Sequence, residues 1–563
     1  MDKTKLWDWK ELKPEFGVLL TQDLSAENIE AWLAEWTETS SKADETYNRV
    51  YVATSVDTVD KEAEAVFTDF IENIYPDWQA QEQKLKKKLL DSGLSPAGFE
   101  IPLRNMRAEA DLFREENLEL KVQEEKISNQ HDKIMGAQTV EWQGGERTVR
   151  YMEVVLRETD REARRDGWEK MAARQLADRE TINQNWRDYM ALRKQIAANA
   201  GKTDFRAYRW QDLKRFDYTP DDCKSFHRAI EEAVVPAVER LAERRRKKLG
   251  IDSLRYYDLF VDLSGDAPLT PFQNARELTD KSKAIFRNVD PVFGEYFDTM
   301  DREGLLDLAN RKNKAAGGYT ADFAWSKKPF VFGNAVGIHD DIQTVLHEGG
   351  HAFHAFESFN LPYIQQNGEG SIPIEFAEVA SMAMEYLTSP YLSADKVGFY
   401  SEKDAARAKV DHIETDMRFW PYMAIVDAFQ HWAYENQDAG ADPDACDAKW
   451  MELEKRFRPY IDWSGFEDVM MTGWQRKDHI HEVPFYYVEY GLALLGAVQV
   501  WRNSISDQKK AVAQYRAALA LGGTVPLPKL FETAGAKFAF DAKTLGEAAA
   551  LMEGKINELE GMY

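Results

Sequence analysis

Cysteine and long apolar runs are scarce in this sequence of 563 residues, and basic residues are fewer than acidic ones. The two cysteines, Cys223 and Cys446, are too few for a disulfide framework, and their spacing matches no cysteine-based metal or redox motif. We therefore expect reduced thiols in a reducing compartment. No apolar run reaches the roughly 18 residues that suggest a membrane-spanning helix, and the first residues contain no apolar segment of a secretory signal. These absences predict a cytoplasmic protein.

Acidic residues outnumber basic ones, with 97 Asp and Glu against 72 Lys and Arg, and the formal net charge is −25. Such a charge repels nucleic acids and anionic membranes, so neither is an expected partner. The basic run Arg244–Lys248 lies within a mixed helical pattern, and we expect it to be a solvated helix face. The length predicts about two to four domains or subdomains, although no Pro-, Ser- or Gly-rich linker separates them.

The most informative segment is HEGGH, from His347 to His351. It has helical periodicity, and side chains four positions apart lie on one face of a helix, so both histidines can direct a ring nitrogen at one metal ion. Glu348 lies about 100° around the helix from His347. There it can hold a water next to the metal without sharing the ligand point of the histidines. Two histidine ligands with a neighbouring general base form the pattern of zinc-dependent hydrolases known as zincins.

The sequence around this motif predicts a helix with two distinct faces. Apolar residues recur on one side, and His347, His351 and His354 fall on the other, which favours a metal site over a solvated helix with scattered histidines. We expect His354 to support the ligands through a hydrogen bond, or to fill a buried position, rather than to bind metal. Gly349 and Gly350 together cost a helix about 2 kcal/mol relative to alanine. We therefore expect another backbone, or a substrate, to pass close to this turn.

A catalytic zinc usually takes three protein ligands, so a third ligand is expected from outside the motif. The segment from Pro373 to Tyr386 predicts a helix that carries Glu375, Glu378 and Glu385. We choose Glu378 as the third ligand and Glu385 as the hydrogen-bond partner of a ligand histidine, because the two lie on nearly one stripe of the helix. Glu375 fits a first-turn acid that answers the helix dipole, but spacing alone does not separate it from Glu378.

Three blocks of the sequence resemble the oligoendopeptidase F family, which belongs to the thimet-type zinc oligopeptidases. The blocks are HEGGHAFH (His347–His354), FAEVASMAMEYL (Phe376–Leu387) and WQRKDHIHEVPFYYVEYG (Trp474–Gly491), and they occur in the order that the family has. The resemblance is strongest between about Arg311 and Trp501 and weaker in the first 200 residues. In the family, the glutamate of the second block is the third zinc ligand, so the resemblance implies Glu378 for this role.

The third block contains His479, His481, Tyr486, Tyr487 and Tyr490 within a short stretch. Peptide hydrolysis passes through a tetrahedral oxyanion, whose charge a tyrosine hydroxyl or a histidine N–H can stabilise. The resemblance implies that a histidine and tyrosines of this block do this. His479 matches the family's histidine best, and we expect the neighbouring His481 to contact substrate. Tyr486 is our first choice for the residue that stabilises the oxyanion, and Tyr490 is the second. Tyr490 is also expected to bind substrate. Tyr487 is expected to be a buried aromatic residue.

Helical periodicity over most of the chain predicts a mainly α-helical fold. A hairpin is predicted at Thr139–Tyr151, with Gly144 and Gly145 in its turn, and two short strands around a Lys-Pro turn are predicted within Gly317–Val336. The second pair directly precedes the HEGGH helix. Its strand edge could pair with an extended peptide, or it could be an ordinary supporting hairpin.

The family resemblance implies a large helical zincin with a small β-sheet near the active site and a deep central channel. Residues 1–200 would then form an N-terminal helical domain and one wall of that channel. Residues 201–563 would form the catalytic zinc-peptidase domain. Members of the family cleave short peptides internally and spare folded proteins, because only a flexible chain enters the channel, and we expect short unstructured peptides as substrates here.

The expected reaction is metal-assisted hydrolysis with one Zn²⁺ per chain. Zinc lowers the pKa of its bound water to about 7, and Glu348 takes the proton from that water as it attacks the peptide carbonyl. Tyr486 and His479 would help zinc to hold the oxyanion, and Glu348 would then protonate the leaving amine.

Two other functions stay open at this point. A zinc carboxypeptidase or dipeptidase would need a positive group for a terminal carboxylate, and Arg476 is the one arginine within the three blocks. A non-catalytic peptide-binding protein would have no need of Glu348. The sequence does not indicate the oligomeric state.

Overall fold

The computed structural model describes residues 6–368 and 370–563, and the chain is mainly α-helical, as predicted. The chain packs into two compact units, each built from three separate segments. The first unit comprises residues 6–110, Leu269–Ala408 and Leu492–Phe538, and the second Asp111–Pro268, Lys409–Gly491 and Ala539–Tyr563. The predicted boundary between an N-terminal domain (residues 1–200) and a catalytic domain (residues 201–563) does not coincide with a boundary of these packing units. That domain division stays a prediction.

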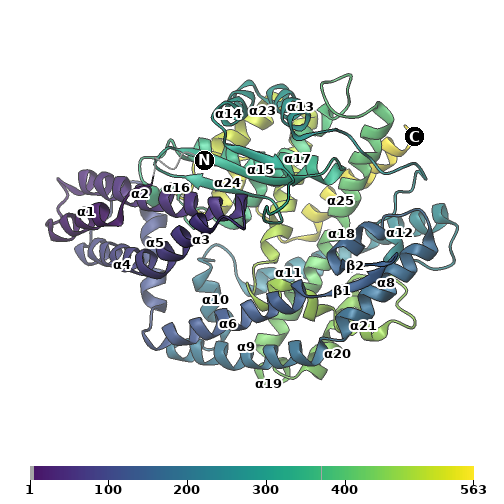
Figure 1. Cartoon of the computed structure of the whole chain (residues 1–563), viewed down its shortest axis with the longest axis horizontal. Helices are drawn as coiled ribbons and strands as arrows, with labels where there is room; N and C mark the ends of the chain where they lie inside the picture. The colour runs from purple at the N-terminus through teal and green to yellow at the C-terminus, as the bar shows by residue number, and fades with distance from the viewer. Residues whose placement is uncertain (1–5, 369) are drawn as a thin grey trace. The chain divides into compact units, whose positions relative to one another are not determined.

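The first unit contains an N-terminal group of helices, a small sheet and the helices that carry the first two motif blocks (Figure 1). The N-terminal helices pack around the buried side chains of Trp32, Trp36 and Leu85. The helices of this unit are α1 (Trp9–Thr21), α2 (Ile29–Val56), α3 (Lys61–Asp69), α4 (Tyr75–Ser92), α5 (Glu100–Leu112), α13 (Ala275–Val289), α14 (Pro291–Arg302), α15 (His339–Ser358), α16 (Ile364–Asn367), α17 (Ile374–Thr388) and α24 (Leu527–Thr533).

The sheet of the first unit has three strands in the order β3–β5–β4. Strand β5 (Lys328–Ala335) runs parallel to β3 (Leu306–Ala309) and antiparallel to β4 (Tyr319–Phe323), which confirms the two predicted strands. The predicted Lys-Pro turn is wrong, because the chain turns between Phe323 and Lys328 and Pro329 lies inside β5. Proline is tolerated there because it stands at the start of the strand.

The second unit is almost entirely helical. Its helices are α6 (Glu116–Gly136), α7 (Val149–Val155), α8 (Arg161–Leu176), α9 (Arg179–Asn199), α10 (Phe205–Asp212), α11 (Pro220–Ala229), α12 (Val235–Leu249), α19 (Gln437–Gly440), α20 (Pro443–Phe457), α21 (Glu467–Met471), α22 (Asp478–His481) and α25 (Ala542–Glu560). Helices α18 (Glu402–Glu435) and α23 (Val488–Leu519) contribute residues to both units, and the last two residues of α5 also belong to the second unit.

The predicted hairpin of the second unit is confirmed. Strand β1 (Thr139–Trp142) pairs antiparallel with β2 (Gly145–Thr148), and two residues form the turn. These are Gln143 and Gly144, one position earlier than predicted, and both have positive φ angles, of 51° and 79°. Two left-handed residues match the twist of a tight hairpin.

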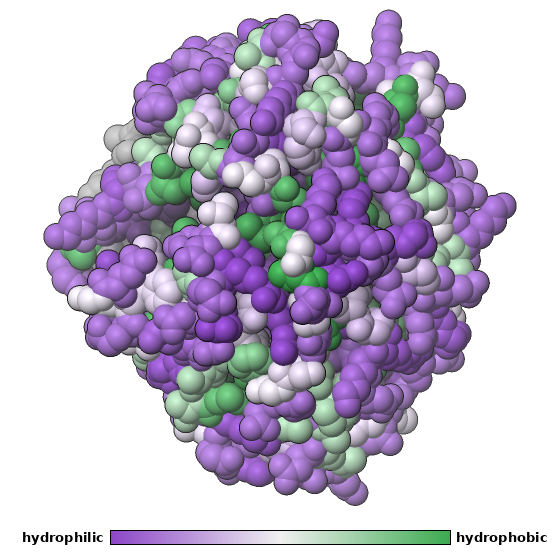
Figure 2. All heavy atoms as spheres, turned by 90° about the vertical axis from the view of Figure 1, so that its right-hand side faces the viewer, coloured by the Kyte–Doolittle hydropathy of each residue, from purple (hydrophilic) through white to green (hydrophobic). Residues whose placement is uncertain are grey.

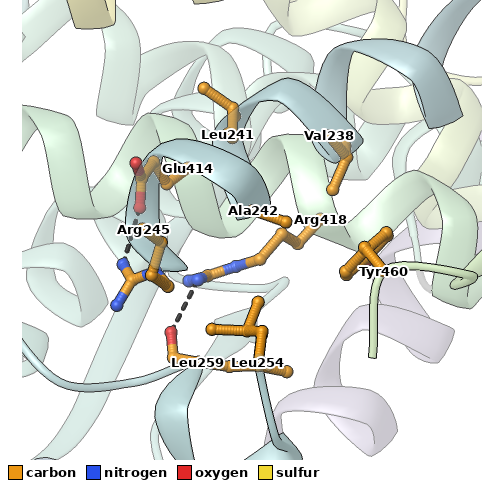
Figure 3. A pocket seen from close by; sticks show the side chains of 9 residues that line it. All are labelled: Val238, Leu241, Ala242, Arg245, Leu254, Leu259, Glu414, Arg418 and Tyr460. Atoms are coloured by element: carbon orange, nitrogen blue, oxygen red, sulfur yellow. Dashed lines mark hydrogen bonds and ion pairs between the residues drawn. The ribbon is translucent and has the colours of Figure 1, made fainter. Parts of the chain in front are cut away.

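A small pocket of the second unit is lined by apolar side chains and by three charged ones (Figure 3). Arg245 donates to the Glu414 carboxylate at 2.7 Å, and Arg418 donates to the carbonyl oxygen of Leu259 at 2.6 Å. None of the residues that line it belongs to the predicted site. These contacts hold the charged groups in place, so the residues around the pocket help to stabilise the packing of the second unit.

The face shown in Figure 2 is mostly hydrophilic, and hydrophobic side chains appear on it in small groups. This agrees with the charged composition of the chain. Within the described residues, no helix combines the length and the apolar character needed to cross a membrane.

Candidate metal centre

Helices α15 and α17 approach each other closely because α15 has glycine where the two meet. A Cβ atom at Gly350 would lie 2.5 Å from the Ala380 oxygen and 2.6 Å from the Ser381 Cα, and real Cβ atoms essentially never come within 3.0 Å of another heavy atom. The backbone expected near this turn is therefore that of α17. Gly349 has a different neighbour, since a Cβ atom there would meet the Phe286 ring at 2.5 Å.

The close approach brings Glu378 of α17 to the two motif histidines of α15. Glu378 Oε2 lies 3.4 Å from His347 Nε2 and 3.8 Å from His351 Nε2. One potential ligand atom from each of the three side chains lies within 4.8 Å of those from the other two. The imidazoles keep partial access to solvent, with 27% and 23% of their side-chain surface exposed, while Glu378 is nearly buried.

These separations fit a zinc ion. Zinc binds imidazole nitrogen and carboxylate oxygen at about 2.0–2.2 Å in a tetrahedron, which places neighbouring ligand atoms roughly 3.3–3.6 Å apart. The observed 3.4 and 3.8 Å lie at and just above that range. Two imidazoles and one carboxylate also leave the fourth position for water or substrate, as catalytic zinc sites do. The donor set therefore suits the predicted metal, and its role as a ligand set stays a prediction.

Glu385 holds the first histidine in position. Its Oε1 atom lies 2.8 Å from His347 Nδ1, so that Nε2 faces the candidate metal position. Burial opposes a charge on His347, but hydrogen bonds with Glu378 and Glu385 raise its pKa well above the ordinary value. Burial lowers the pKa of His351. A metal ion would therefore displace a proton from His347 and find His351 neutral, and its apparent affinity would fall at acid pH.

Glu348 lies next to His347 on α15, and its side chain contacts the sheet. Its Oε2 atom accepts a hydrogen bond from Thr320 Oγ1 at 2.7 Å, and the same hydroxyl lies 3.2 Å from the Glu348 carbonyl oxygen. Thr320 belongs to the edge strand β4. Thr320 was not among the predicted site residues. The only signal for it in the sequence was a hydroxyl side chain in a strand predicted just before the HEGGH helix.

His354 is fully enclosed by the packing of the first unit, with 3% of its surface exposed. Its ring meets Phe376 edge to face at a centroid distance of 5.9 Å, and its Nε2 atom has no hydrogen-bond partner within the described residues. Burial and the charge of His351 lower its pKa to about 3. Of the two alternatives predicted for it, the buried position fits, and no supporting hydrogen bond is made through Nε2.

The third motif block lies in the second unit. The His479 ring lies 5.9, 4.9 and 6.0 Å from the rings of Tyr486, Tyr487 and Tyr490. Tyr487 is buried and also packs against Phe419, as predicted, whereas His479, Tyr486 and Tyr490 keep some exposed surface. The cluster therefore contains a histidine and two tyrosines that can still meet a ligand, and their catalytic roles stay predictions.

The environment of His479 keeps it neutral. Burial and the neighbouring charge of Lys477 lower its pKa to about 4, and burial lowers the pKa of Lys477 to about 8. A neutral imidazole at pH 7 can still donate one N–H hydrogen bond.

The structure corrects the prediction for His481. This residue has no exposed surface and stacks on His131, with ring centroids 4.3 Å apart, and on Trp474. Substrate contact does not fit such burial, so His481 is part of the core of the second unit. Residues two positions apart on a helix point in nearly opposite directions. On α22, His479 therefore keeps exposed surface while His481 points into the core.

The fold and these residues define a mainly helical protein with a candidate metal centre of two histidines and one glutamate. A sequence model described as "Peptidase family M3" matches residues 154–549, and one described as "Peptidase M3 N-terminal domain" matches residues 3–97. The chain belongs to peptidase family M3.

Individual relatives agree with this membership. The chain is similar to an "Oligoendopeptidase F homolog" of Borreliella burgdorferi, with 24% identity over 53% of this chain and 49% of the relative, and to "Oligopeptidase PepF" of Bacillus subtilis, with 23% identity over 58% and 47%. The chain thus matches about half the length of these curated relatives. The solved structure titled "PZ PEPTIDASE A with inhibitor 2" has a TM-score of 0.87 and 26% identity, over 98% of both chains.

Proposed function

We propose that the protein is a zinc-dependent endopeptidase that hydrolyses internal bonds of short, unstructured peptides. The convergence of His347, His351 and Glu378, with Glu348 held beside them, is the observation that carries the proposal. Membership of peptidase family M3 supports the reaction class. The names of the oligoendopeptidase and oligopeptidase relatives support short peptides as substrates.

Each side chain of the centre has a defined task in this reaction. Zinc, when held by the two histidines and Glu378, would activate water and polarise the peptide carbonyl. Glu348 accepts the proton of the attacking water and passes it to the leaving nitrogen, and the hydrogen bond from Thr320 fixes its carboxylate for both transfers. We assign to Tyr486 and His479 the hydrogen bonds that stabilise the oxyanion, with Tyr490 as the alternative tyrosine.

Strand β4 is the proposed binding edge for the peptide backbone. It pairs with β5 on one side only, and within the described residues no further strand pairs with its other edge. Thr320 connects this strand directly to Glu348. An extended peptide that adds to the edge would be held through its main chain, which would allow many sequences.

The Glu348→Gln variant tests the assignment of the base. Glutamine keeps the size and the hydrogen bond to Thr320 but cannot take a proton, so turnover of a quenched peptide should fall by about 10²- to 10⁴-fold. Zinc content should stay at the wild-type level, because Glu348 is not a ligand. Near wild-type turnover in this variant would refute its role as general base.

Product mapping separates the proposed function from the two alternatives. Cuts within the peptide that disappear with a chelator and return with zinc would support the endopeptidase. Stepwise loss of terminal residues would instead indicate a carboxypeptidase or dipeptidase, and binding without cleavage a peptide-binding protein. A cytoplasmic location and the absence of nucleic-acid and membrane partners rest on composition and stay predictions.

A further inference from the structure

Two helices of the second unit bring together four side chains that can bind metal, outside the motif blocks. Cys223 and His227 are four positions apart on α11, so they share one face of that helix. Asp427 and His431 have the same spacing on α18. The sequence pattern is thus Cys-x3-His on one helix and Asp-x3-His on the other.

These side chains meet in the interior. Sulfur, oxygen and nitrogen ligand atoms of Cys223, Asp427 and His431 lie within 4.8 Å of one another. Cys223 and Asp427 have no exposed surface, and His431 has 2%. The His227 and His431 rings meet edge to face at a centroid distance of 5.9 Å. Burial this deep sets the cluster apart from chance groupings of metal-binding residues on a surface.

Two atoms of this cluster carry unused bonding capacity. Asp427 Oδ1 and His431 Nε2 are buried and have no hydrogen-bond partner within the described residues. His431 Nε2 lies 3.3 Å from Asp427 Oδ2. A buried polar atom without a partner costs about 1–3 kcal/mol, so such atoms in a native core require an explanation.

A zinc ion bound by the Asp427 carboxylate and by His431 Nε2 would give both side chains a further partner. Zinc bonds of about 2.0–2.2 Å to nitrogen and oxygen place two ligand atoms roughly 3.3–3.6 Å apart in a tetrahedron. The 3.3 Å between His431 Nε2 and Asp427 Oδ2 agrees with this spacing. Thiolate and imidazole together favour zinc over magnesium or calcium, which prefer oxygen ligands.

We propose that Cys223, Asp427 and His431 bind a structural zinc ion that ties α11 to α18, in addition to the metal of the candidate catalytic centre. On binding, the Cys223 thiol releases its proton to solvent and the thiolate bonds the metal. The thiolate and the Asp427 carboxylate then balance the two charges of the ion. This matters in a buried site, where an uncompensated charge is costly.

The groups around the three ligands suit this role. His227 Nε2 lies 2.7 Å from Asp427 Oδ2, so His227 orients the carboxylate from outside, as the outer partners of metal ligands do. Arg206 approaches His431 Nδ1 at 3.3 Å and also pairs with Glu435. A metal on Nε2 places the ring proton on Nδ1, so Arg206 must release His431 and keep Glu435.

Cobalt replacement tests the proposal through the sulfur ligand. Protein produced in cobalt-supplemented, zinc-depleted medium should show the near-ultraviolet charge-transfer absorption of a cobalt–thiolate bond. The candidate catalytic centre has no cysteine ligand and cannot contribute to this band, so the result is independent of the proposed function. Absence of the band from cobalt-containing wild-type protein would overturn the proposal.

The two cysteines supply a matched pair of variants. Cys446 is also buried, but its Sγ atom contacts the carbonyl oxygen of Gly440, outside the cluster. Cys446→Ser should keep the band. Because Cys223 is then the only cysteine left in the chain, the band would identify Cys223 as the thiolate ligand of cobalt. Loss of the band in Cys446→Ser with the band kept in Cys223→Ser would overturn the assignment.

Zinc content gives a second, spectroscopy-free readout. Wild-type protein purified from zinc-supplemented medium should contain about two zinc ions per chain, and Cys223→Ser about one, as should His351→Ala through loss of the other site. One zinc ion per chain in the wild type, removed entirely by His351→Ala, would show that the cluster in the second unit binds none.

Discussion

At the scale of single residues, the predicted metal ligands were accessible from the sequence because their arrangement is local. Two histidines four positions apart must share a helix face, whatever the rest of the fold does. The partner of Glu348 is different, because Thr320 reaches it from a strand of the sheet and only tertiary packing brings the two together. That His481 is buried while His479 keeps exposed surface could likewise not be predicted from the sequence.

Thr320 is predicted to position the general base. In Thr320→Val the Glu348 carboxylate loses a hydrogen bond worth about 1.5–3 kcal/mol, so kcat should fall by about 10- to 100-fold, with little change in KM. Thr320→Ser keeps the hydroxyl and should restore most of the rate. Steady-state kinetics on a quenched peptide, with thermal unfolding as the stability control, provide the measurement. Equal activity in the valine and serine variants would contradict this role.

At the scale of elements, the packing of α15 on α17 sets the distance between the histidines and the glutamate of the candidate metal centre. Tyr515 fixes the same region of α17, since its hydroxyl donates to the Ala380 carbonyl oxygen at 2.6 Å. The two glycines in the motif signalled a close neighbour from the sequence alone. The sequence did not show that Gly350 faces a backbone while Gly349 faces the Phe286 ring, because both depend on how distant segments pack.

Gly350→Ala should push α15 and α17 apart. The new methyl group would overlap the Ala380 carbonyl, which should cost about 1–3 kcal/mol of stability and lower the affinity for zinc. Gly554 of α25 is the matched control, because a Cβ atom there meets nothing within 4 Å. Gly554→Ala should stabilise the protein by up to about 1 kcal/mol. Thermal unfolding and zinc titration measure both; unchanged zinc affinity in Gly350→Ala would contradict the packing account.

The Cys-x3-His and Asp-x3-His pairs show a second limit of sequence reasoning at this scale. Comparing only the spacing between cysteines led to the expectation of two unrelated thiols. The four-residue spacing from Cys223 to His227 was present but is common by chance in helices. The Cys223–His227 spacing indicates a metal site only in the folded protein, where Cys223 of α11 lies close to Asp427 and His431 of α18.

At the scale of the whole molecule, the three motif blocks divide between the two packing units. His347, Glu378 and their neighbours belong to the first unit, and His479 and Tyr486 to the second. The three blocks follow one another along the chain, but they do not belong to one compact unit. Helical content was predictable because it follows from local periodicity, whereas the assembly of each unit from three segments depends on long-range packing.

The stability of the second unit should fall in acid through Glu414. Burial acts to raise the pKa of this carboxyl, but the charges of Arg245 and Arg418 hold it below the ordinary value. An unfolded glutamate titrates near pH 4.3, so below about pH 4.5 the unfolded chain binds more protons than the folded one and stability declines. Removing one partner of such a buried pair costs about 3–5 kcal/mol, which Glu414→Gln should lose at neutral pH.

Unfolding followed across pH tests this origin of acid sensitivity. The stability difference between wild type and Glu414→Gln should be largest at neutral pH. It should shrink as the pH falls below about 4.5, because the Glu414 carboxyl of the unfolded chain then takes up a proton before that of the folded chain does. Glu64→Gln, which breaks the exposed pair of Glu64 with Lys61, should change stability little at any pH. A difference for Glu414→Gln that does not depend on pH would contradict the account.

Anomalous diffraction at the zinc absorption edge, from crystals of the protein grown without chelator, tests the central claim most directly. We predict a peak about 2.0–2.2 Å from His347 Nε2, His351 Nε2 and a Glu378 oxygen. Crystals that contain zinc by X-ray fluorescence but show no peak among these three side chains would contradict the proposed metal centre.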